Sequence, residues 1–216
     1  MTKYSKLLSN VIGQKIDYFS LDALQKAKLF YDCEFYTRAG KIFFAYQEYN
    51  YALDAFLKGN DGEGIVYSYT KLGRIQNAID AAIKFKLYAL AGSLYEQIGD
   101  YPNAARFFSL KTPVKAATYY IKSDMHYEAG ICYLNSERYD LAFFEFNKCK
   151  NPAEVQQGLQ SLEEVAVVLY FDKKYIEAYQ IFIKLKLFDS ALICAYELKD
   201  KQLIKESKIL IKKMSA

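Results

Sequence analysis

Small residues recur along the chain at intervals of thirteen, and they set the pattern of apolar and polar positions. The strict part of this series, with successive spacings of 13, 26, 13, 13, 13 and 13, comprises Ala39, Ala52, Ala78, Ala91, Ala104, Ala117 and Gly130. The missing step falls near Ile65, where Gly64 and Val66 stand. A looser continuation comprises Ala142, Ala166, Ala178 and Ala191. Thirteen residues suit a helix of about 9–11 residues followed by a tight turn, and two such helices make a hairpin.

Large side chains occupy fixed places relative to these small residues. Five copies of the hairpin pattern can be counted from an origin at Gly40, Val66, Gly92, Gly130 and Ala166, and twelve residues on is the second alanine of each copy: Ala52, Ala78, Ala104, Ala142 and Ala178. Three residues after the origins stand Phe43, Tyr69, Tyr95, Tyr133 and Leu169. Three before the second alanine of each copy stand Tyr49, Ile75, Tyr101, Tyr139 and Tyr175, and four after it stand Phe56, Ala82, Phe108, Phe146 and Phe182. Spacings of three and four residues place these side chains on one helical face, and small residues let two helix axes approach closely. One hairpin cannot bury such a face alone, so the pattern predicts stacked neighbours.

The residues that start and end helices agree with this division. The three prolines, Pro102, Pro113 and Pro152, each fall in the first turn of a predicted helix, and glycines such as Gly73 and Gly99 fall between helices. We expect about fifteen short helices and no strand, which together form an all-α, right-handed superhelical solenoid of stacked antiparallel hairpins. We further expect N-terminal helices over 1–37, a repeat body over 38–198 and a basic C-terminal capping helix over 199–216.

Charge separates the end of the chain from its body. The net charge is +4, and residues 199–216, with six lysines and two acids, account for all of it. A body that sums to zero disfavours nucleic-acid binding there, although a lysine face formed by Lys201, Lys205, Lys208 and Lys212 remains available for phosphate. No apolar run is long enough for a membrane span. Residues 1–16 carry three lysines and no acid; we expect an ordinary first helix there rather than a mitochondrial presequence, which would usually contain arginine.

Catalytic, metal-binding and cofactor-binding motifs were not found. The four cysteines, Cys33, Cys132, Cys149 and Cys194, are too far apart for a zinc site, and we expect them to be buried thiols in a reducing intracellular compartment. His126, the single histidine, occupies the aromatic position three residues before Ala129, which indicates packing rather than catalysis. The sequence therefore predicts no enzyme, no metal and no cofactor, and the 21 tyrosines and 15 phenylalanines are interpreted as core residues.

Over about residues 38–196 the chain resembles the tetratricopeptide (TPR) repeat. A small residue followed by x-x-Tyr, then Gly99, Tyr101, Ala104 and Phe108, carries this resemblance best, within the segment AGSLYEQIGDYPNAARFFSL. The repeat here is 26 residues, whereas a TPR repeat has about 34 and a closing proline. The shorter hairpins look like the solenoids of intraflagellar-transport and vesicle-coat subunits, and like the C-terminal tails of UvrD-like helicases.

The resemblance implies a partner-binding groove on the first helix of each hairpin. Carried over position by position, its candidate residues are Lys41, Phe44, Tyr67, Lys71, Ser93 and Glu96. The Lys–Asn pair with which some TPR domains grip a carboxylate is absent, because Thr37 and Lys41 stand at those places. The alternative for Phe44 and Tyr67 is that they only pack between hairpins.

The expected function is a non-enzymatic protein–protein interaction or scaffold module that binds a peptide or helix of another protein. This expectation rests on analogy between folds. One alternative is the helical region of a helicase-like, nucleic-acid-associated protein whose terminal lysines touch phosphate. A third is a regulatory domain of an enzyme.

Overall fold

The structure, a computed structural model, describes residues 20–215, and these residues form fourteen α-helices and no strand. Within each of the two compact units described below, successive helices pack against one another in chain order, in a repeated arrangement consistent with a solenoid. The prediction of an all-α array of short helices is therefore confirmed for this part of the chain. The contacts divide the chain into two compact units, Met1–Asp100 and Tyr101–Ala216, which we call unit 1 and unit 2.

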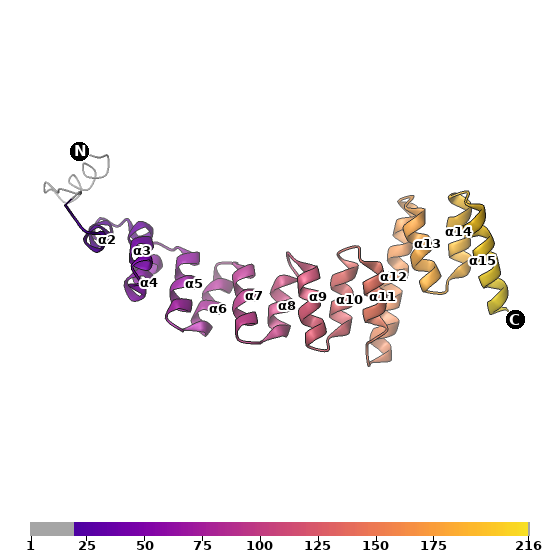
Figure 1. Ribbon diagram of the computed structural model, residues 1–216, viewed down its shortest axis with the longest axis horizontal. Helices are drawn as coiled ribbons and strands as arrows, with labels where there is room; N and C mark the ends of the chain where they lie inside the picture. The colour runs from indigo at the N-terminus through magenta and orange to yellow at the C-terminus, as the bar shows by residue number, and fades with distance from the viewer. Residues whose placement is uncertain (1–19, 216) are drawn as a thin grey trace. The chain divides into compact units, whose positions relative to one another are not determined.

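The described part of unit 1 contains six helices of 10 residues each (Figure 1). They are α2 (Ala23–Asp32), α3 (Tyr36–Ala45), α4 (Tyr49–Lys58), α5 (Gly62–Lys71), α6 (Ile75–Lys84) and α7 (Tyr88–Gln97). Each contacts the next, and α3 also contacts α5.

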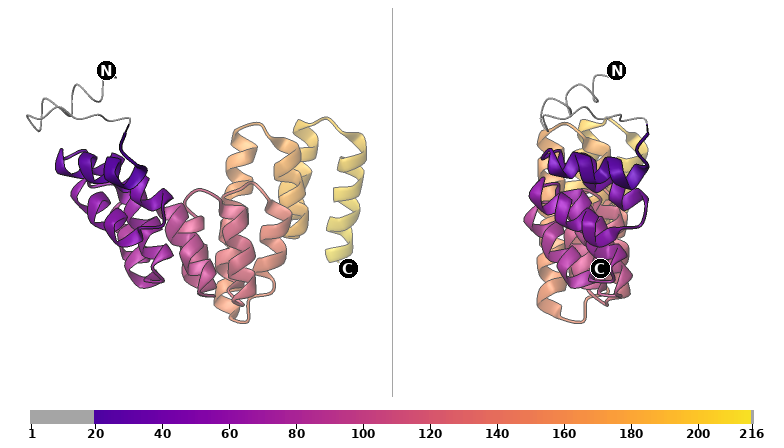
Figure 2. Two further views of the ribbon diagram at one scale, coloured as in Figure 1. Left: turned by 60° about the vertical axis from the view of Figure 1, so that its left-hand side comes forward. Right: turned by 90° about the vertical axis from the view of Figure 1, so that its left-hand side faces the viewer.

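Unit 2 contains eight described helices. They are α8 (Tyr101–Phe108), α9 (Pro113–Lys122), α10 (His126–Leu134), α11 (Tyr139–Phe146), α12 (Pro152–Phe171), α13 (Tyr175–Lys184), α14 (Phe188–Glu197) and α15 (Lys201–Met214). Figure 2 shows the last three of them, coloured orange to yellow, side by side. Contacts of α10 with α12 and of α11 with α13 lie across one intervening helix.

Most helices begin with an aromatic residue and carry a small residue at their fourth position. The aromatic first residues are Tyr36, Tyr49, Tyr88, Tyr101, His126, Tyr139, Tyr175 and Phe188. The fourth residues Ala39, Ala52, Ala78, Ala91, Ala104, Ala116, Ala129, Ala142, Ala178 and Ala191 are all 0% exposed. A methyl group at this place lets the neighbouring backbones approach closely, which explains why the small-residue period is also the helix period.

The helix boundaries add two details to the small-residue series. Ile65, not Gly64 or Val66, is the fourth residue of α5, and with 3% of its surface exposed it fills the missing step. In unit 2 the fourth residues of α9 and α10 are Ala116 and Ala129, one position before the predicted Ala117 and Gly130. The shift arises because α8 is only 8 residues long and the turn after it has a different form.

The turns explain the constancy of the thirteen-residue period. Most helices are joined by a turn of three residues: the C-cap of one helix, a residue with positive φ, and the N-cap of the next helix. The first such turn is Cys33, Glu34 (φ 63°) and Phe35. The N–H of Glu34 donates to the carbonyl of Tyr31 at 3.0 Å and that of Phe35 to the carbonyl of Phe30 at 2.8 Å, which is a Schellman motif. In unit 1 the positive φ recurs every thirteen residues, at Glu34, Gln47, Asn60, Gly73, Lys86 and Gly99.

Unit 2 departs from this strict repetition in two places. The helix α9 is an additional helix between two copies of the predicted hairpin pattern, and α12 has 20 residues, twice the length of most others. Asn151 starts α12 with a side-chain cap and Pro152 follows at the first helical position. The length of α12 accounts for the looser spacing after Ala142, and the one-residue shift at α8 accounts for the step of 12 residues from Gly130 to Ala142.

Candidate functional site

Three of the six predicted partner-binding residues surround one cavity in unit 1. The cavity has a volume of about 250 Å³ and is lined by Lys41, Phe44, Phe56, Asp61, Glu63, Gly64 and Tyr67. Lys41 and Phe44 come from α3, Phe56 from α4, and Gly64 and Tyr67 from α5. The structure thus brings together the α3 and α5 positions that the TPR resemblance implies.

A glycine and a capping carboxylate shape this cavity, which we call the α3–α5 cavity. A Cβ atom on Gly64 would lie 2.4 Å from the ring of Phe56, so only glycine permits this approach. Asp61 caps α5, its Oδ1 accepting the N–H of Gly64 at 3.1 Å, and this bond fixes the carboxylate at the cavity. Acidic Glu63 and basic Lys41 are both exposed, so the opening presents both signs of charge.

The two aromatic residues of the α3–α5 cavity differ in how firmly they are held. Phe44 is half-buried and meets Tyr49 edge to face, with ring centroids 5.3 Å apart. Tyr67 keeps 46% of its surface exposed. Phe44 therefore packs against α4 as well as lining the cavity, whereas Tyr67 still has apolar surface that a partner could cover.

The other three predicted groove residues do not line the α3–α5 cavity. Lys71 is exposed at the last position of α5. On α7, Ser93 donates its hydroxyl to the carbonyl of Ala89 at 3.0 Å, and Glu96 is half-buried.

The predicted lysine face lies on α15. Lys201, Lys205, Lys208 and Lys212 are all exposed, whereas Leu203, Ile204, Leu210 and Ile211 are partly buried. Lys208 Nζ lies 5.5 Å from the ring centroid of Tyr196, which is a cation–π contact with α14. Asp200 caps the helix with two bonds, to the N–H groups of Gln202 and Leu203. Such a helix has the polar outer face that a terminal cap needs.

His126 is half-buried at the first position of α10, as its aromatic position indicates, but it also belongs to a charge network that the sequence did not reveal. Its Nδ1 lies 2.7 Å from Oε2 of the buried Glu145, and its Nε2 lies 3.1 Å from Oδ1 of Asp124. Lys148 contacts the other oxygen of Glu145 at 3.1 Å, and Lys150 contacts Asp124. Since carboxylates only accept, the imidazolium form is the one that donates to both. Nineteen residues separate His126 from Glu145, so no local motif announces the pair.

The cysteines are free thiols with low reactivity. Cys33, Cys132 and Cys194 are buried and Cys149 is half-buried. Burial, with a contribution from the Glu128 carboxylate, raises the pKa of Cys132 to about 11, and burial also raises the pKa of the other three. Within residues 20–215, no group of histidine, cysteine and acidic side chains has the arrangement of a metal site.

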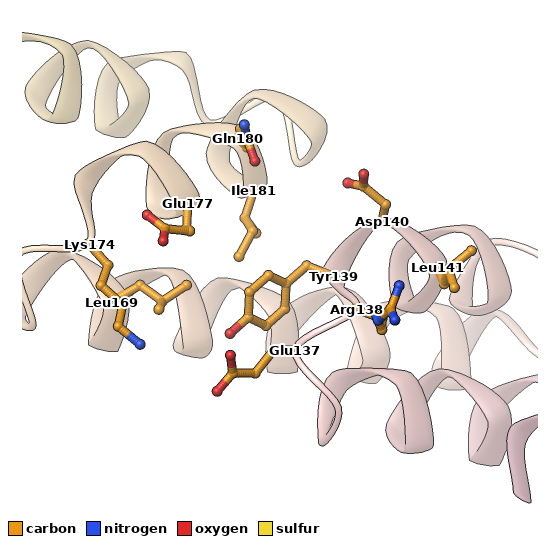
Figure 3. Close-up of a pocket in the computed structure, with 10 residues that line it drawn as sticks. All are labelled: Glu137, Arg138, Tyr139, Asp140, Leu141, Leu169, Lys174, Glu177, Gln180 and Ile181. Atoms are coloured by element: carbon orange, nitrogen blue, oxygen red, sulfur yellow. The ribbon is translucent and has the colours of Figure 1, made fainter. Parts of the chain in front are cut away.

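A second hollow, of about 470 Å³, lies in unit 2, and no sequence pattern predicted it. It is lined by Glu137, Arg138, Tyr139, Asp140, Leu141, Leu169, Lys174, Glu177, Gln180 and Ile181 (Figure 3). Asp140 and Glu177 stand in the first turns of α11 and α13, where acidic residues are common because they favour the helix dipole. The sequence therefore gives no sign that the two acids line the same hollow, because this depends on the contact between α11 and α13.

No protein-family model matches the chain, and no curated protein matches it. Of the helices that the structure describes, none combines the length and the apolar character required to cross a lipid bilayer.

Proposed function

We propose that this protein is a non-enzymatic interaction module, TPR-like in its hairpins, that binds a peptide or helix of another protein at the α3–α5 cavity. The observation that carries the proposal is the convergence of Lys41, Phe44 and Tyr67 on one cavity. Repeated hairpins support it, because stacked repeats present extended surfaces for partners.

The contacts favour a partner side chain that is apolar and lies close to charged groups. Covering the exposed part of Tyr67 removes apolar surface from water, which stabilises a complex by about 25 cal/mol per Å². Aromatic anchors tend to dominate binding energy where they become fully desolvated. Lys41 on one side and Asp61 and Glu63 on the other then discriminate between partners by charge.

The test is affinity capture from a lysate by the parent, by Tyr67→Ala and by the matched control Tyr46→Ala. Tyr46 is 57% exposed at the end of α3 and does not line the α3–α5 cavity. We expect the parent and Tyr46→Ala to capture a partner protein equally well, and Tyr67→Ala to lose it. We also expect all three proteins to have the same melting temperature, and nuclease treatment to leave the capture unchanged. Retention by all three proteins would contradict the proposal. Lost stability of Tyr67→Ala alone would instead assign Tyr67 to the core.

One observation favours a second candidate, association with nucleic acid. The four lysines of α15 are exposed on one face, and Tyr196 beneath Lys208 offers a ring on which a base could stack. Under this alternative, changing all four lysines to glutamine abolishes salt-sensitive binding of a single-stranded oligonucleotide. Under the main proposal the same variant retains its fold and its protein partner, because the lysines only solvate the cap.

The non-enzymatic part of the proposal rests on the state of the reactive side chains. Both ring nitrogens of His126 face carboxylates, and raised pKa values keep the four thiols protonated near neutral pH. No cofactor is part of the proposal, and free thiols suit a reducing compartment such as the cytoplasm or nucleus.

The predictions about residues 1–16 concern a part of the chain outside the described residues.

A further inference from the structure

The helix α12 leaves three apolar side chains near its C-terminal end exposed to water. Of its 20 residues only Gly158, Leu162, Ala166 and Leu169 are buried, which is one narrow stripe. On its C-terminal half Val167, Val168 and Phe171 are 42%, 58% and 75% exposed. Adjacent exposed apolar side chains of this kind mark interaction surfaces more often than isolated ones do.

This surface continues into a groove. The hollow shown in Figure 3 shares Glu137, Tyr139, Leu169 and Lys174 with a second hollow of about 560 Å³, so the two hollows adjoin, and we call them together the groove. The second hollow is lined by Val168, among others, which joins the exposed surface of α12 to it. Buried Leu169 and Ile181 provide an apolar floor beside the ring of Tyr139.

The rim of the groove is predominantly acidic. Its lining includes five carboxylates (Glu137, Asp140, Glu164, Asp172 and Glu177) and two cations (Arg138 and Lys174). Asp140 is paired with Lys184 at 3.0 Å. Burial raises the pKa of the Tyr139 hydroxyl, and the charges of Glu137 and Glu177 raise it further. This field attracts cations and repels phosphates and acidic peptides.

We propose that the groove formed by the α10–α11 turn, the C-terminal half of α12 and the start of α13 is a docking surface for a basic amphipathic helix of a partner protein. The apolar side chains of such a helix would cover Val168 and Phe171, and its lysines or arginines would meet Glu137, Glu164 and Glu177. The surface lies wholly in unit 2 and is separate from the α3–α5 cavity, so this inference goes beyond the proposed function and can fail independently of it.

The test uses the full chain and a synthetic probe, because charge and apolar pattern define the expected ligand. The probe is a fluorescent peptide of about 18 residues, or five helical turns, with leucines on one face and lysines on the other. Two matched peptides replace all lysines by glutamate or all leucines by serine. Binding is measured by fluorescence anisotropy at low and at moderate salt.

Variants then locate the binding. Glu137→Gln with Glu177→Gln removes two charges from the rim, and Phe171→Ser removes the most exposed apolar residue of α12. The controls lie elsewhere in unit 2: Glu197→Gln with Glu206→Gln makes the same change in net charge, and Ile193→Ser alters another exposed residue, 52% exposed on α14. Circular dichroism checks that every variant is folded, and a photo-reactive copy of the probe maps its contacts by mass spectrometry.

We expect the leucine–lysine probe to bind the parent and both controls equally, and each groove variant about tenfold or more weakly. We expect the two matched peptides to bind far more weakly than the probe, and cross-links to fall on α12 and α13. Equal binding by parent and groove variants, equal loss in the controls, or equal binding of the glutamate peptide would overturn the proposal. If a groove variant is unfolded, the cross-links on the parent protein test the proposal instead: cross-links on α12 and α13 would support it, and cross-links elsewhere would overturn it.

Discussion

At the level of single residues, the turns depend on one position with positive φ, which glycine tolerates best. Gly73 (φ 73°) holds this place after α5, and Lys86 (φ 57°) holds it after α6. A Cβ on Gly73 would meet no atom within 4 Å, so a substitution there acts through the backbone alone. We expect Gly73→Ala to lower the free energy of unfolding by roughly 1–2 kcal/mol, because a left-handed alanine is strained.

The reverse substitution at the equivalent turn, Lys86→Gly, should change the stability in the opposite direction. Lys86→Gly relieves the same strain, but the greater freedom of glycine in the unfolded chain offsets part of the gain. We expect a stabilisation of about 0.5 kcal/mol, measured by urea denaturation alongside Gly73→Ala. If Lys86→Gly were as destabilising as Gly73→Ala, the turn would not depend on φ at this position.

Titration of Cys132 gives a prediction about alkaline pH. The folded pKa is about 11 against an ordinary value of 9.0. Because the folded pKa is raised, the stability contributed by the neutral thiol is fully present below pH 9 and is lost as the pH rises toward 11. We expect Cys132→Val, which retains a small apolar side chain, to lose less stability than the parent between these two pH values. Denaturant unfolding at several pH values measures the difference, and parallel curves would contradict the raised pKa.

At the level of helices, the closest packing occurs where a phenylalanine is enclosed by glycines. In unit 2 the ring of Phe146 on α11 lies between Gly130 of α10 and Gly158 of α12, and a Cβ on these glycines would come within 2.4 Å and 2.3 Å of it. In unit 1 Phe56 stands in the same way between Gly40 and Gly64, at 2.7 Å and 2.4 Å. The glycines thus set the distance between α10 and α12, and between α3 and α5.

The variant Gly158→Ala tests this packing against helix propensity. In an exposed helix, alanine is more favourable than glycine by about 1 kcal/mol. If the contact between position 158 and Phe146 were loose, Gly158→Ala would therefore make the protein more stable. A tight contact predicts overpacking, and we expect Gly158→Ala to destabilise unit 2 by about 1–3 kcal/mol. Thermal and urea denaturation measure the sign, and combining the change with Phe146→Leu should recover much of the loss.

Most helices could be predicted from the sequence because they repeat the same local pattern. An aromatic first residue and a small fourth residue are three positions apart, so a short window of sequence shows them together. The contacts Gly40–Phe56 and Gly130–Phe146 recur at the same spacing of 16 residues and so follow the repeat. The His126–Glu145 contact and the acidic groove of unit 2 join residues from different helices, and their spacing follows no period. The short helix α8 and the long helix α12 shift the repeat, which is why the spacing of the series changes after Gly130.

At the level of the whole molecule, stability should be local. In each unit the extensive contacts join helices that are neighbours or next but one along the chain. Such an array behaves as a sum of repeat stabilities and nearest-neighbour interfaces, so a local defect need not open distant repeats.

Hydrogen exchange on Ala178→Leu tests this locality. Ala178 is 0% exposed at the fourth position of α13, and leucine there forces its neighbours apart. We expect amide protection to fall in α12, α13 and α14 by a factor of ten or more, equivalent to about 1.4 kcal/mol, while α3, α4 and α5 keep theirs. Ala52→Leu, the matched change in α4, should give the reverse pattern. Equal loss of protection throughout both units would show that the chain opens as one cooperative block.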